Sequence, residues 1–424
     1  MAKVIVGLGS NRGDRLANLR WALLELKAVA SLHAVSPVYE SEAMLPEGAP
    51  AEWNRTFFNL AAEVETTLAP ESLLAAVKKI EAKLGRSSAE RWAPREIDLD
   101  LLALERGSYR AAGLEIPHPG LAERPFALLP LLDLWPEYWA GPHPWLWSET
   151  RPFNTRKTTH ALTRLMGIVN VTPDSFSGDG VGSDLARAEA QIERLIGGGA
   201  AILDFGAEST RPGGTPLTPG EEWSRLGPVF ESLVPRLKGR AIVSLDSRHP
   251  ETIKRALGLG VQWINDVTGA GHDEIRAAAR EHGAKLVAMH SLTVPVVRER
   301  VLSDDKDPVE TVLAWGFEKL RELRAAGLRD DQIVLDPGIG FGKTPQQNLH
   351  LLNEAWRFHA WGVEVLIGHS RKSFMGRFTA LPPAERDLET ALLSARLARQ
   401  GIEYLRVHEP ALSERAIGTF QFLR

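Results

Sequence analysis

The chain has 424 residues, of which 44% are hydrophobic and 25% are charged, and it contains no cysteine. This composition is typical of a globular protein with two or three domains, and the lack of cysteine excludes disulfides, thiolate metal sites and cysteine nucleophiles. The formal net charge of −4 provides no overall basic field that would suggest binding to nucleic acid or to an anionic membrane.

The sequence predicts neither a transmembrane segment nor a signal peptide. No uninterrupted apolar run approaches about 18 residues. The N-terminal stretch MAKVIVGLGSNRGDR becomes polar after a few apolar positions. We therefore expect a cytoplasmic protein that does not associate with a membrane.

The first third of the chain alternates strands and helices in the order β-α-β-β-α-β. The expected strands are residues 3–9, 32–40, 57–66 and 96–104, and the expected helices are residues 15–29 and 70–84. A further apolar stretch, RPFALLPLLDLW, predicts one more helix near residue 130. The order is that of a ferredoxin-like α+β domain, which we place at residues 1–135.

Two glycine-rich stretches are similar to nucleotide-binding loops but lack the required spacing. The glycines of GLGSNRGDR, residues 7–15, lie one position too far apart for a dinucleotide-binding loop. In DPGIGFGKT, residues 336–344, Pro337 stands where a phosphate-binding P-loop requires glycine. Neither stretch is interpreted as a nucleotide site.

Two aspartates mark the strand REIDLDLL. Asp98 and Asp100 alternate with apolar residues, so a strand with a period of two places both carboxylates on one face. Arg86, Arg91 and Arg95 lie close by in the sequence. The residues alone leave two interpretations open. Either the aspartates ligate Mg²⁺ on a polyphosphate and the arginines neutralise the phosphates, or the group is a structural cluster of salt bridges.

The segment that follows is rich in tryptophan and proline and shows almost no periodicity. It reads LWPEYWAGPHPWLWSETRPFNTRKTTH, and we interpret residues 136–159 as a linker between two domains.

After the linker, eight apolar strands alternate with helical patterns. The expected strands are residues 165–171, 200–206, 241–247, 262–268, 285–290, 333–338, 364–370 and 403–409. Eight such units in about 260 residues have the size and order of a (β/α)8 TIM barrel, which we place at residues 160–424.

Almost every expected barrel strand ends in polar residues. These residues are Asn170, Asp246, Asn265, Asp266, His290, Asp336, Ser370, Arg406 and His408. Because the C-terminal ends of barrel strands meet at one mouth, where barrel enzymes carry their chemistry, the pattern predicts an active site there. Polar residues that only mark where strands leave the core would explain one or two of these positions.

Five motifs within residues 1–135 support a family resemblance. They are GLGSNRGD, FFNLAAEVET, KIEAKLGR, ERWAPREIDLDLL and IPHPGLAERPFALLPL. In their order and spacing the segment resembles the 6-hydroxymethyl-7,8-dihydropterin pyrophosphokinase family along its whole length. The resemblance implies transfer of pyrophosphate from ATP to the hydroxymethyl oxygen of the pterin, which leaves AMP.

The resemblance also implies roles for single residues. Asp98 and Asp100 would hold two Mg²⁺ ions on ATP, while Arg95 and Arg86 would contact phosphates and act with the aspartates in catalysis. The other residues implied to bind ATP are Arg91, Trp92, His118 and Arg124, and those implied to bind the pterin are Asn59 and Phe126.

Seven motifs after residue 160 support a second resemblance. They are MGIVNVTPDSFS, DFGAESTRPGG, SLDS, INDVTG, DPGIGFGKT, GHSRKSF and RVHEP. With them the barrel resembles dihydropteroate synthase. The resemblance implies loss of pyrophosphate from the pterin, attack by the amine of p-aminobenzoate, and a homodimer formed through the barrel. A pterin-binding methyltransferase shares the barrel but would not be expected to combine STRPGG, SRKSF and RVH.

This second resemblance assigns residues to three ligands. Those implied to bind the pterin are Asp246, Asn265, Met289, Asp336, Phe341 and Lys372, of which Asp246 and Lys372 are also implied to be catalytic. Those implied to bind pyrophosphate are Asn170, Arg406 and His408, with one Mg²⁺ near Asn170. Thr210, Arg211 and Ser370 would line the p-aminobenzoate side, and loops 172–182 and 208–218 would close over the intermediate.

The favoured hypothesis is thus a bifunctional folate-pathway transferase. Three alternatives remain at this stage: one active half with the other retained as a scaffold, a pterin-binding methyl-transfer barrel, or a simple nucleotide hydrolase.

Overall fold

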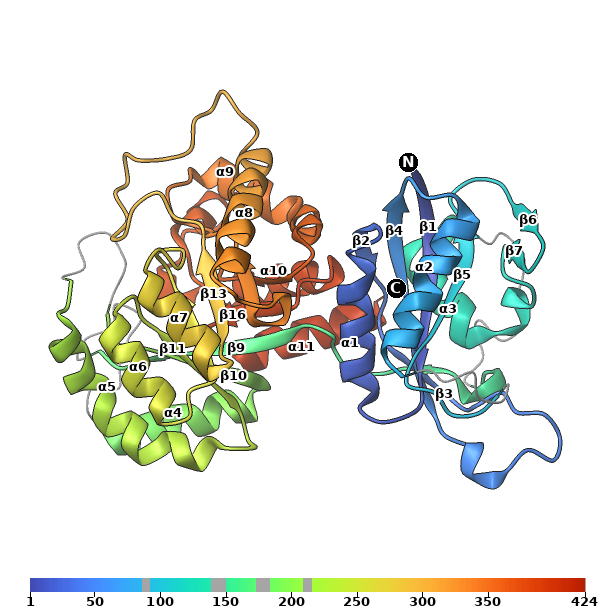
Figure 1. Ribbon diagram of the computed structural model, residues 1–424, viewed down its shortest axis with the longest axis horizontal. Helices are drawn as coiled ribbons and strands as arrows, with labels where there is room; N and C mark the ends of the chain where they lie inside the picture. The colour runs from blue at the N-terminus through green and yellow to red at the C-terminus, as the bar shows by residue number, and fades with distance from the viewer. Residues whose placement is uncertain (86–91, 139–149, 173–183, 209–215, 424) are drawn as a thin grey trace. The chain divides into compact units, whose positions relative to one another are not determined.

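A computed structural model describes residues 1–85, 92–138, 150–172, 184–208 and 216–423. The chain divides into two compact units (Figure 1). The first unit comprises residues 1–162 and two short segments near the C-terminus, and the second comprises residues 163–397 and 402–417. Among the residues that the structure describes, no helix has the length and apolar character needed to cross a bilayer.

The N-terminal unit is built on an antiparallel sheet in the order β5-β1-β4-β3-β8, with β2 also paired to β4. Its strands are β1 (Ala2–Ser10), β2 (Ser31–Val35), β3 (Tyr39–Ser41), β4 (Phe57–Thr66), β5 (Asp98–Leu104) and β8 (Arg156–Lys157), and β6 (Tyr109–Ala111) and β7 (Leu114–Ile116) form a separate hairpin. This arrangement confirms the ferredoxin-like order.

Three differences from the expected strands have local causes. The strand expected at 32–40 is two strands, because Pro37 between them has no backbone N–H to donate to a ladder. The hairpin of β6 and β7 was not expected, since its strands have only three residues each. Two residues of the expected linker form β8, while residues 139–149 of that segment lie outside the described part of the chain.

Helices cover both faces of this sheet. α1 (Arg15–Leu26) and α2 (Pro70–Lys83) pack their apolar residues on one face, and α3 (Pro125–Leu134) packs on the other. The short 3-10 helices are η1 (Ala51–Trp53), η2 (Leu121–Glu123), η3 (Pro136–Tyr138) and η4 (Pro152–Asn154). The α3 face carries only a small apolar cluster, which leaves room there for polar residues of β1, β4 and β5.

The C-terminal unit is a closed barrel of eight parallel strands, as the sequence predicted. The strands are β9 (Arg164–Asn170), β10 (Ala200–Gly206), β11 (Ile242–Asp246), β12 (Trp263–Asp266), β13 (Lys285–Met289), β14 (Ile333–Asp336), β15 (Glu364–Ile367) and β16 (Tyr404–Val407). Each strand pairs with the next, and β16 closes on β9.

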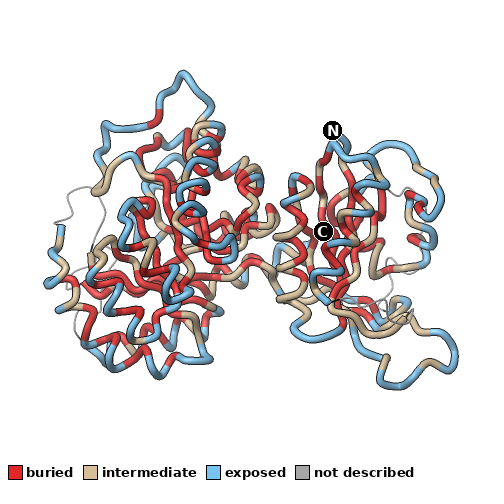
Figure 2. The backbone as a smooth tube through the Cα atoms, in the orientation of Figure 1, coloured by how far each residue is buried: buried red, intermediate tan, exposed pale blue. Residues whose placement is uncertain are grey.

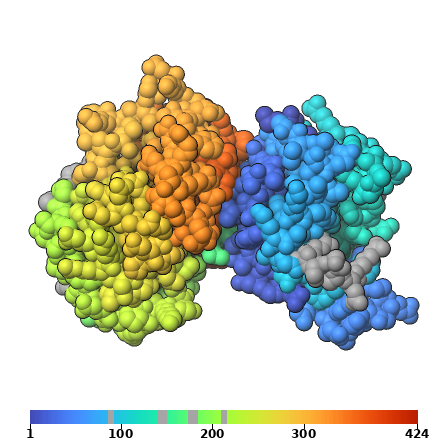
Figure 3. Space-filling view, viewed as in Figure 1, coloured from blue at the N-terminus to red at the C-terminus, as the bar shows by residue number. Residues whose placement is uncertain are grey.

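Helices surround the barrel. They are α4 (Leu185–Gly197), α5 (Pro219–Leu233), α6 (Pro250–Gly258), α7 (Asp273–His282), α8 (Pro308–Ala325), α9 (Pro345–Asn353), α10 (Asp387–Arg399) and α11 (Pro410–Phe422). The 3-10 helices are η5 (Val234–Leu237), η6 (Asp330–Gln332), η7 (Ala355–Trp361), η8 (Ser373–Arg377) and η9 (Pro383–Glu385). The long connection between β13 and α8 projects from this unit (Figures 1 and 3).

Apolar side chains from all the strands fill the barrel interior. Seven strands contribute one buried residue each to a single cluster, and Ile242 of β11 packs against it partly buried. Trp263 and Tyr404 meet edge to face in this cluster, with ring centroids 4.8 Å apart. Figure 2 shows that burial is concentrated along the strands. A filled barrel core leaves the polar strand ends as the place for chemistry.

Candidate active sites

In the N-terminal sheet, strand register places Asn59 and the two aspartates on one face. Gly9 lies opposite both Asn59 of β4 and Asp98 of β5, and Gly7 lies opposite Asp100. Opposed residues of antiparallel strands point to the same face. A Cβ atom on Gly9 would lie 3.0 Å from Oδ1 of Asn59. The glycine therefore keeps the space between amide and carboxylate open.

Each aspartate has a cation beside it. Nη1 of Arg95 lies 3.0 Å from Oδ2 of Asp98, and Nζ of Lys78 lies 3.4 Å from Oδ1 of Asp100. The side chains of Asp98 and Asp100 are 27% and 40% exposed to solvent. Two solvent-accessible carboxylates on one face are the oxygen donors that Mg²⁺ prefers, so this site fits Mg²⁺ bound to phosphates.

Lys78 and Glu81 of α2 were not among the expected site residues. Oε1 of Glu81 accepts hydrogen bonds of 2.7 Å from Leu99 N–H and from Nζ of Lys78. Lys78 also donates to the Leu99 carbonyl at 2.7 Å. Burial raises the pKa of Glu81. Lys78 and Glu81 hold the β5 backbone at Leu99, the residue between the two aspartates. In the sequence, the only signal for this pair is its i,i+3 spacing, which places both side chains on one face of a helix.

The remaining N-terminal candidates have these positions. Nδ2 of the buried Asn59 donates to Oγ of Ser41 at 2.9 Å. Phe126, in the first turn of α3, packs edge to face on Phe153, with ring centroids 5.4 Å apart. His118 and Arg124 flank η2, and Trp92 precedes β5 with a φ of 81°. Arg86 and Arg91 lie outside the described residues.

In the barrel, Asp204 of β10 is the centre of a hydrogen-bond network, although it was not among the expected residues. This fully buried carboxylate accepts from Arg406 Nε at 2.6 Å, from Asn265 Nδ2 at 2.9 Å and from Ser244 Oγ at 2.6 Å. Arg406 also donates through Nη2 to Oδ2 of Asp246 at 2.7 Å. The network joins residues of four barrel strands and confirms that Asp246, Asn265 and Arg406 meet.

Burial gives Asp246 an unusual ionisation. It raises the pKa of the Asp246 carboxyl to about 7, against the attraction of the Arg406 guanidinium, while Asp204 adds to the rise. Its side chain is still 18% exposed. Asp246 can therefore hold or release a proton near neutral pH while it faces the barrel mouth.

Asp336 and Lys372 also come together. Oδ1 of the buried Asp336 accepts from the N–H of Gly338 at 2.7 Å, and burial raises its pKa against the attraction of Lys372. Nζ of Lys372 lies 4.8 Å from the ring centroid of Phe341 and donates to the Ile339 carbonyl. A carboxylate, a cation and a ring face thus lie at the ends of β14 and β15, where a flat polar heterocycle could bind.

Ser370 and His408 are in direct contact. Oγ of Ser370 lies 2.9 Å from Nδ1 of His408 and accepts from its backbone N–H at 3.2 Å. The residue after Ser370, Arg371, has a φ of 57° and forms a two-point ion pair with Asp387 of α10, at 2.7 and 2.8 Å. This pair anchors the turn that presents Ser370 and Lys372.

Two residues expected at the barrel mouth, Asp266 and His290, form hydrogen bonds with neighbouring loop residues. Asp266 accepts from the N–H and Oγ1 of Thr268 and from the N–H of Ala270. His290 Nδ1 lies 2.9 Å from Nζ of Lys343. Burial lowers the pKa of Lys343 to about 7 and that of His290 to about 3. These side chains stabilise the loops after β12 and β14.

The other barrel candidates are partly described. Asn170 ends β9 half-buried, and Met289 ends β13 buried and opposite Asp336. Thr210 and Arg211 lie outside the described residues, as does most of both loops expected to close.

Comparison with known proteins matches both halves of the chain. The family model of 7,8-dihydro-6-hydroxymethylpterin-pyrophosphokinase matches residues 5–136, and that of pterin binding enzymes matches residues 166–408. A folate synthesis bifunctional protein of Chlamydia caviae is 37% identical, over 98% of this chain and 96% of that protein.

Solved structures resemble the barrel. Dihydropteroate synthase from Anaplasma phagocytophilum, with bound 6-hydroxymethylpterin-monophosphate, is 34% identical with a TM-score of 0.57 and covers 62% of this chain and 100% of that one. The Xanthomonas albilineans enzyme with 4-aminobenzoic acid is 35% identical with a TM-score of 0.56 and covers 61% and 92% of the two chains.

Proposed function

The chain belongs to the family of bifunctional folate-synthesis proteins, and from this premise we propose which of its residues serve each reaction. The enzyme has two activities. As a 6-hydroxymethyl-7,8-dihydropterin pyrophosphokinase it transfers pyrophosphate from ATP to the pterin and leaves AMP. As a dihydropteroate synthase it joins the pterin to p-aminobenzoate, which gives 7,8-dihydropteroate and pyrophosphate.

The three alternatives are disfavoured by the extent of the similarity. The Chlamydia relative matches 98% of the chain, so both halves are accounted for by one bifunctional protein. A methyl-transfer barrel and a simple nucleotide hydrolase would each leave part of this similarity unexplained, and a scaffold half is disfavoured because that relative is a bifunctional protein.

For the first reaction, the row formed by Asn59, Gly9 and Asp98 supports our assignment. Adjacent strands lie about 4.8 Å apart, so Asn59 and Asp98 are separated by about 10 Å across the glycine. A pterin hydrogen-bonded to Asn59 and stacked on Phe126 can thus direct its hydroxymethyl group toward phosphates near Asp98. The hydroxymethyl oxygen forms a bond to the β-phosphorus and releases its proton, while the bond from this phosphorus to the bridging oxygen breaks and AMP leaves with the bonding electrons.

Asp98 and Asp100 would hold the two Mg²⁺ ions of ATP in this assignment. Mg²⁺ supplies neutralisation of the charge on the phosphate oxygens. Arg95 contacts the phosphates together with Arg86, and Arg91, Trp92, His118 and Arg124 bind the rest of ATP. Lys78 and Glu81 keep the aspartates in position through the Leu99 backbone.

For the second reaction, the barrel network supports our assignment. Asp336 accepts the adjacent N–H groups of the pterin, with Asn265, Asp246 and Lys372 around the ring and Met289 and Phe341 against its faces. Arg406, fixed by Asp204, and His408 bind the pyrophosphate that leaves with the electrons of the C–O bond. The amine nitrogen then forms the new C–N bond and loses a proton.

Three further assignments complete the proposal. One Mg²⁺ near Asn170 would neutralise the departing pyrophosphate. The amide oxygen of Asn170, at the end of β9, is a suitable ligand for this ion. Ser370 with Thr210 and Arg211 would line the p-aminobenzoate side. The barrel would pair as a homodimer. Leu388 and Leu392 support this, since they lie one turn apart on α10 and are 64% and 61% exposed.

A coupled assay tests the assignment of the first site. The purified chain receives 6-hydroxymethyl-dihydropterin, Mg²⁺-ATP and p-aminobenzoate, and AMP and dihydropteroate are followed. We expect Asp98→Ala to abolish AMP formation and to retain dihydropteroate synthesis from pre-formed pterin pyrophosphate. If Asp98→Ala still forms AMP from pterin and ATP at the wild-type rate, the aspartate pair is structural and the assignment is wrong.

A further inference from the structure

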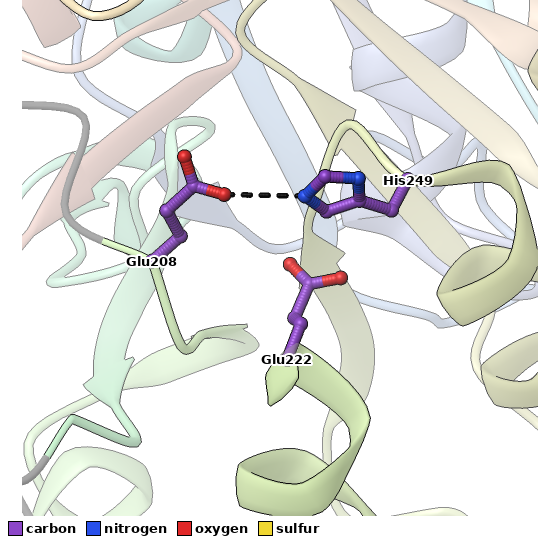
Figure 4. Close-up of side chains that lie close together, drawn as sticks. All are labelled: Glu208, Glu222 and His249. Atoms are coloured by element: carbon purple, nitrogen blue, oxygen red, sulfur yellow. Dashed lines mark hydrogen bonds and ion pairs between the residues drawn. The ribbon is translucent and has the colours of Figure 1, made fainter. Parts of the chain in front are cut away.

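Three side chains outside both proposed reaction sites converge at the connections that follow β10 and β11. Glu208 lies two residues after β10, Glu222 lies in the first turns of α5, and His249 is the N-cap of α6. Figure 4 shows the three side chains pointing toward one another. One donor atom from each lies within 4.8 Å of the others.

The group is buried and its hydrogen bonding is incomplete. The side chains of Glu208 and His249 are 6% and 13% exposed, and Glu222 is 1% exposed. Oε2 of Glu208 lies 3.2 Å from Nε2 of His249, and Oε2 of Glu222 accepts from Oγ of Ser247 at 2.8 Å. Among the described residues, Oε1 of Glu222 makes no hydrogen bond of normal geometry, and neither does the nearby hydroxyl of Thr252, although this hydroxyl partly stabilises the carboxylate and lowers its pKa.

The charges around the group leave it negative. Arg248 is paired with Oε1 of Glu208, through Nη2 at 2.9 Å and Nε at 3.3 Å, so it offsets one carboxylate. His249 carries no charge unless it is protonated. Burial raises the pKa of Glu222, and Glu208 adds to this rise. A buried carboxylate whose hydrogen bonding is incomplete is stabilised by a proton or by a bound cation.

We propose that Glu208, Glu222 and His249 bind a divalent transition-metal ion of the zinc class. One imidazole nitrogen and two carboxylate oxygens form a donor set suited to Zn²⁺ and its neighbours, whereas Mg²⁺ and Ca²⁺ prefer oxygen donors alone. Such a site has three protein ligands and leaves the fourth position to water.

One of the three ligand separations already matches that of a tetrahedral site. Two ligands at the usual zinc distances lie about 3.3 Å apart. Glu208 and His249 already have this separation, at 3.2 Å. The nearest Glu222 oxygen lies within 4.8 Å of both other ligand atoms, so an inward movement of this side chain, away from Thr252, would complete the site. Oε1 of Glu208 can keep its ion pair with Arg248 while Oε2 binds the metal.

Bound metal would link the start of one expected active-site loop to two helices. Glu208 directly precedes the segment that contains Thr210 and Arg211. The metal would join it to α5 and α6, and thus fix the point where that loop begins. The three ligands are not among the residues assigned to either reaction, so the binding test is independent of the proposed function.

Metal binding to the untagged full-length chain tests the proposal. After chelator treatment, Zn²⁺ is titrated calorimetrically in excess Mg²⁺, with an Asp98→Asn/Asp100→Asn background to silence the N-terminal carboxylates. We expect one equivalent to bind, and we expect Co²⁺ in its place to give the intense visible absorption of a four-coordinate ion. His249→Gln and Glu222→Gln should each weaken binding by about tenfold or more.

A matched control separates this site from adventitious binding. His272 is likewise a histidine at a helix N-cap without a side-chain capping bond, at the start of α7, and it is exposed. His272→Gln should bind Zn²⁺ with the same affinity and stoichiometry as the Asp98→Asn/Asp100→Asn background. Thermal melting verifies folding, and if Glu222→Gln fails to fold, His249→Gln decides. Absence of stoichiometric binding, or unchanged affinity in His249→Gln, overturns the proposal and leaves an ionic hydrogen-bond cluster.

Discussion

Arg406 donates hydrogen bonds to two carboxylates at once, from Nε to Asp204 at 2.6 Å and from Nη2 to Asp246 at 2.7 Å. Asp204 is completely buried and also accepts from Asn265, so it fixes the orientation of two residues assigned to substrate. The guanidinium is therefore held in place before any substrate arrives. This preorganisation is what a barrel that binds pyrophosphate needs.

Asp204→Asn tests this positioning role. The substitution keeps the shape but removes the charge that holds Arg406, and we expect about 1–3 kcal/mol of lost stability. The KM for pterin pyrophosphate should rise and dihydropteroate formation should slow, while AMP formation by the N-terminal site stays unchanged. Asp331→Asn, at a largely exposed aspartate, is the control. If both variants have the same KM for pterin pyrophosphate, Asp204 does not position Arg406 for substrate binding.

The raised pKa of Asp246 predicts a pH dependence. Dihydropteroate formation should show an inflection near pH 7 that disappears in Asp246→Asn. The direction in which stability changes with pH depends on whether the folded or the unfolded state binds more protons. The folded pKa lies above the unfolded value of about 3.9, so the folded state holds more protons between about pH 4 and pH 7, and this group's contribution to stability falls as pH rises through that window. Denaturant unfolding across this range should show a smaller decline for Asp246→Asn than for wild type.

Gly9→Ala tests the row across the N-terminal sheet. The new Cβ would lie 3.0 Å from Oδ1 of Asn59, so the amide that we assign to the pterin must shift. Because small displacements of positioning groups reduce rates strongly, we expect the KM for hydroxymethyl-dihydropterin to rise by about tenfold or more. Initial rates of AMP formation measure this change. Gly258→Ala, where a Cβ meets nothing within 4 Å, should leave these rates unchanged.

The Arg371–Asp387 ion pair is expected to support the barrel site from outside it. Its side chains are 11% and 21% exposed, and Arg371 has a positive φ. Arg371→Gly tolerates this backbone conformation but adds chain entropy, so only the double-mutant cycle isolates the loss of the pair. Arg371→Gly and Asp387→Asn should each raise the KM values of the barrel reaction. A double-mutant cycle on unfolding free energy should give a coupling of about 0.5–3 kcal/mol. Additive effects would show that the pair contributes nothing to the turn.

Local sequence was sufficient for the elements whose signals are local. The period of two in β5 predicted that Asp98 and Asp100 share a face, and the register with Gly7 and Gly9 confirms it. The alternation of strands and helices predicted the barrel, because each of these patterns also extends over only a few neighbouring residues. Pro37, which has no backbone N–H, is the local signal that divides the strand at 32–40.

The residues that sequence reasoning missed act through distant partners. Asp204 lies near the C-terminal end of an apolar strand, two residues before its last residue, and its partner Arg406 lies 202 positions later in the chain. Lys78 and Glu81 lie on a helix and reach β5 only after the helix packs on the sheet. Conversely, Asp266 ends β12 and His290 directly follows β13, but both side chains form hydrogen bonds that stabilise neighbouring loops.

The sequence by itself determined the two folds, the family and the strand-end positions where chemistry gathers, because periodicity and motif spacing depend on near neighbours along the chain. Closure of the barrel and pairing of the sheet decided which of those side chains meet, which are buried strongly enough to change ionisation, and that Glu208, Glu222 and His249 converge. Burial and hydrogen-bond partnership depend on residues brought together from distant positions, so only the tertiary structure could assign them.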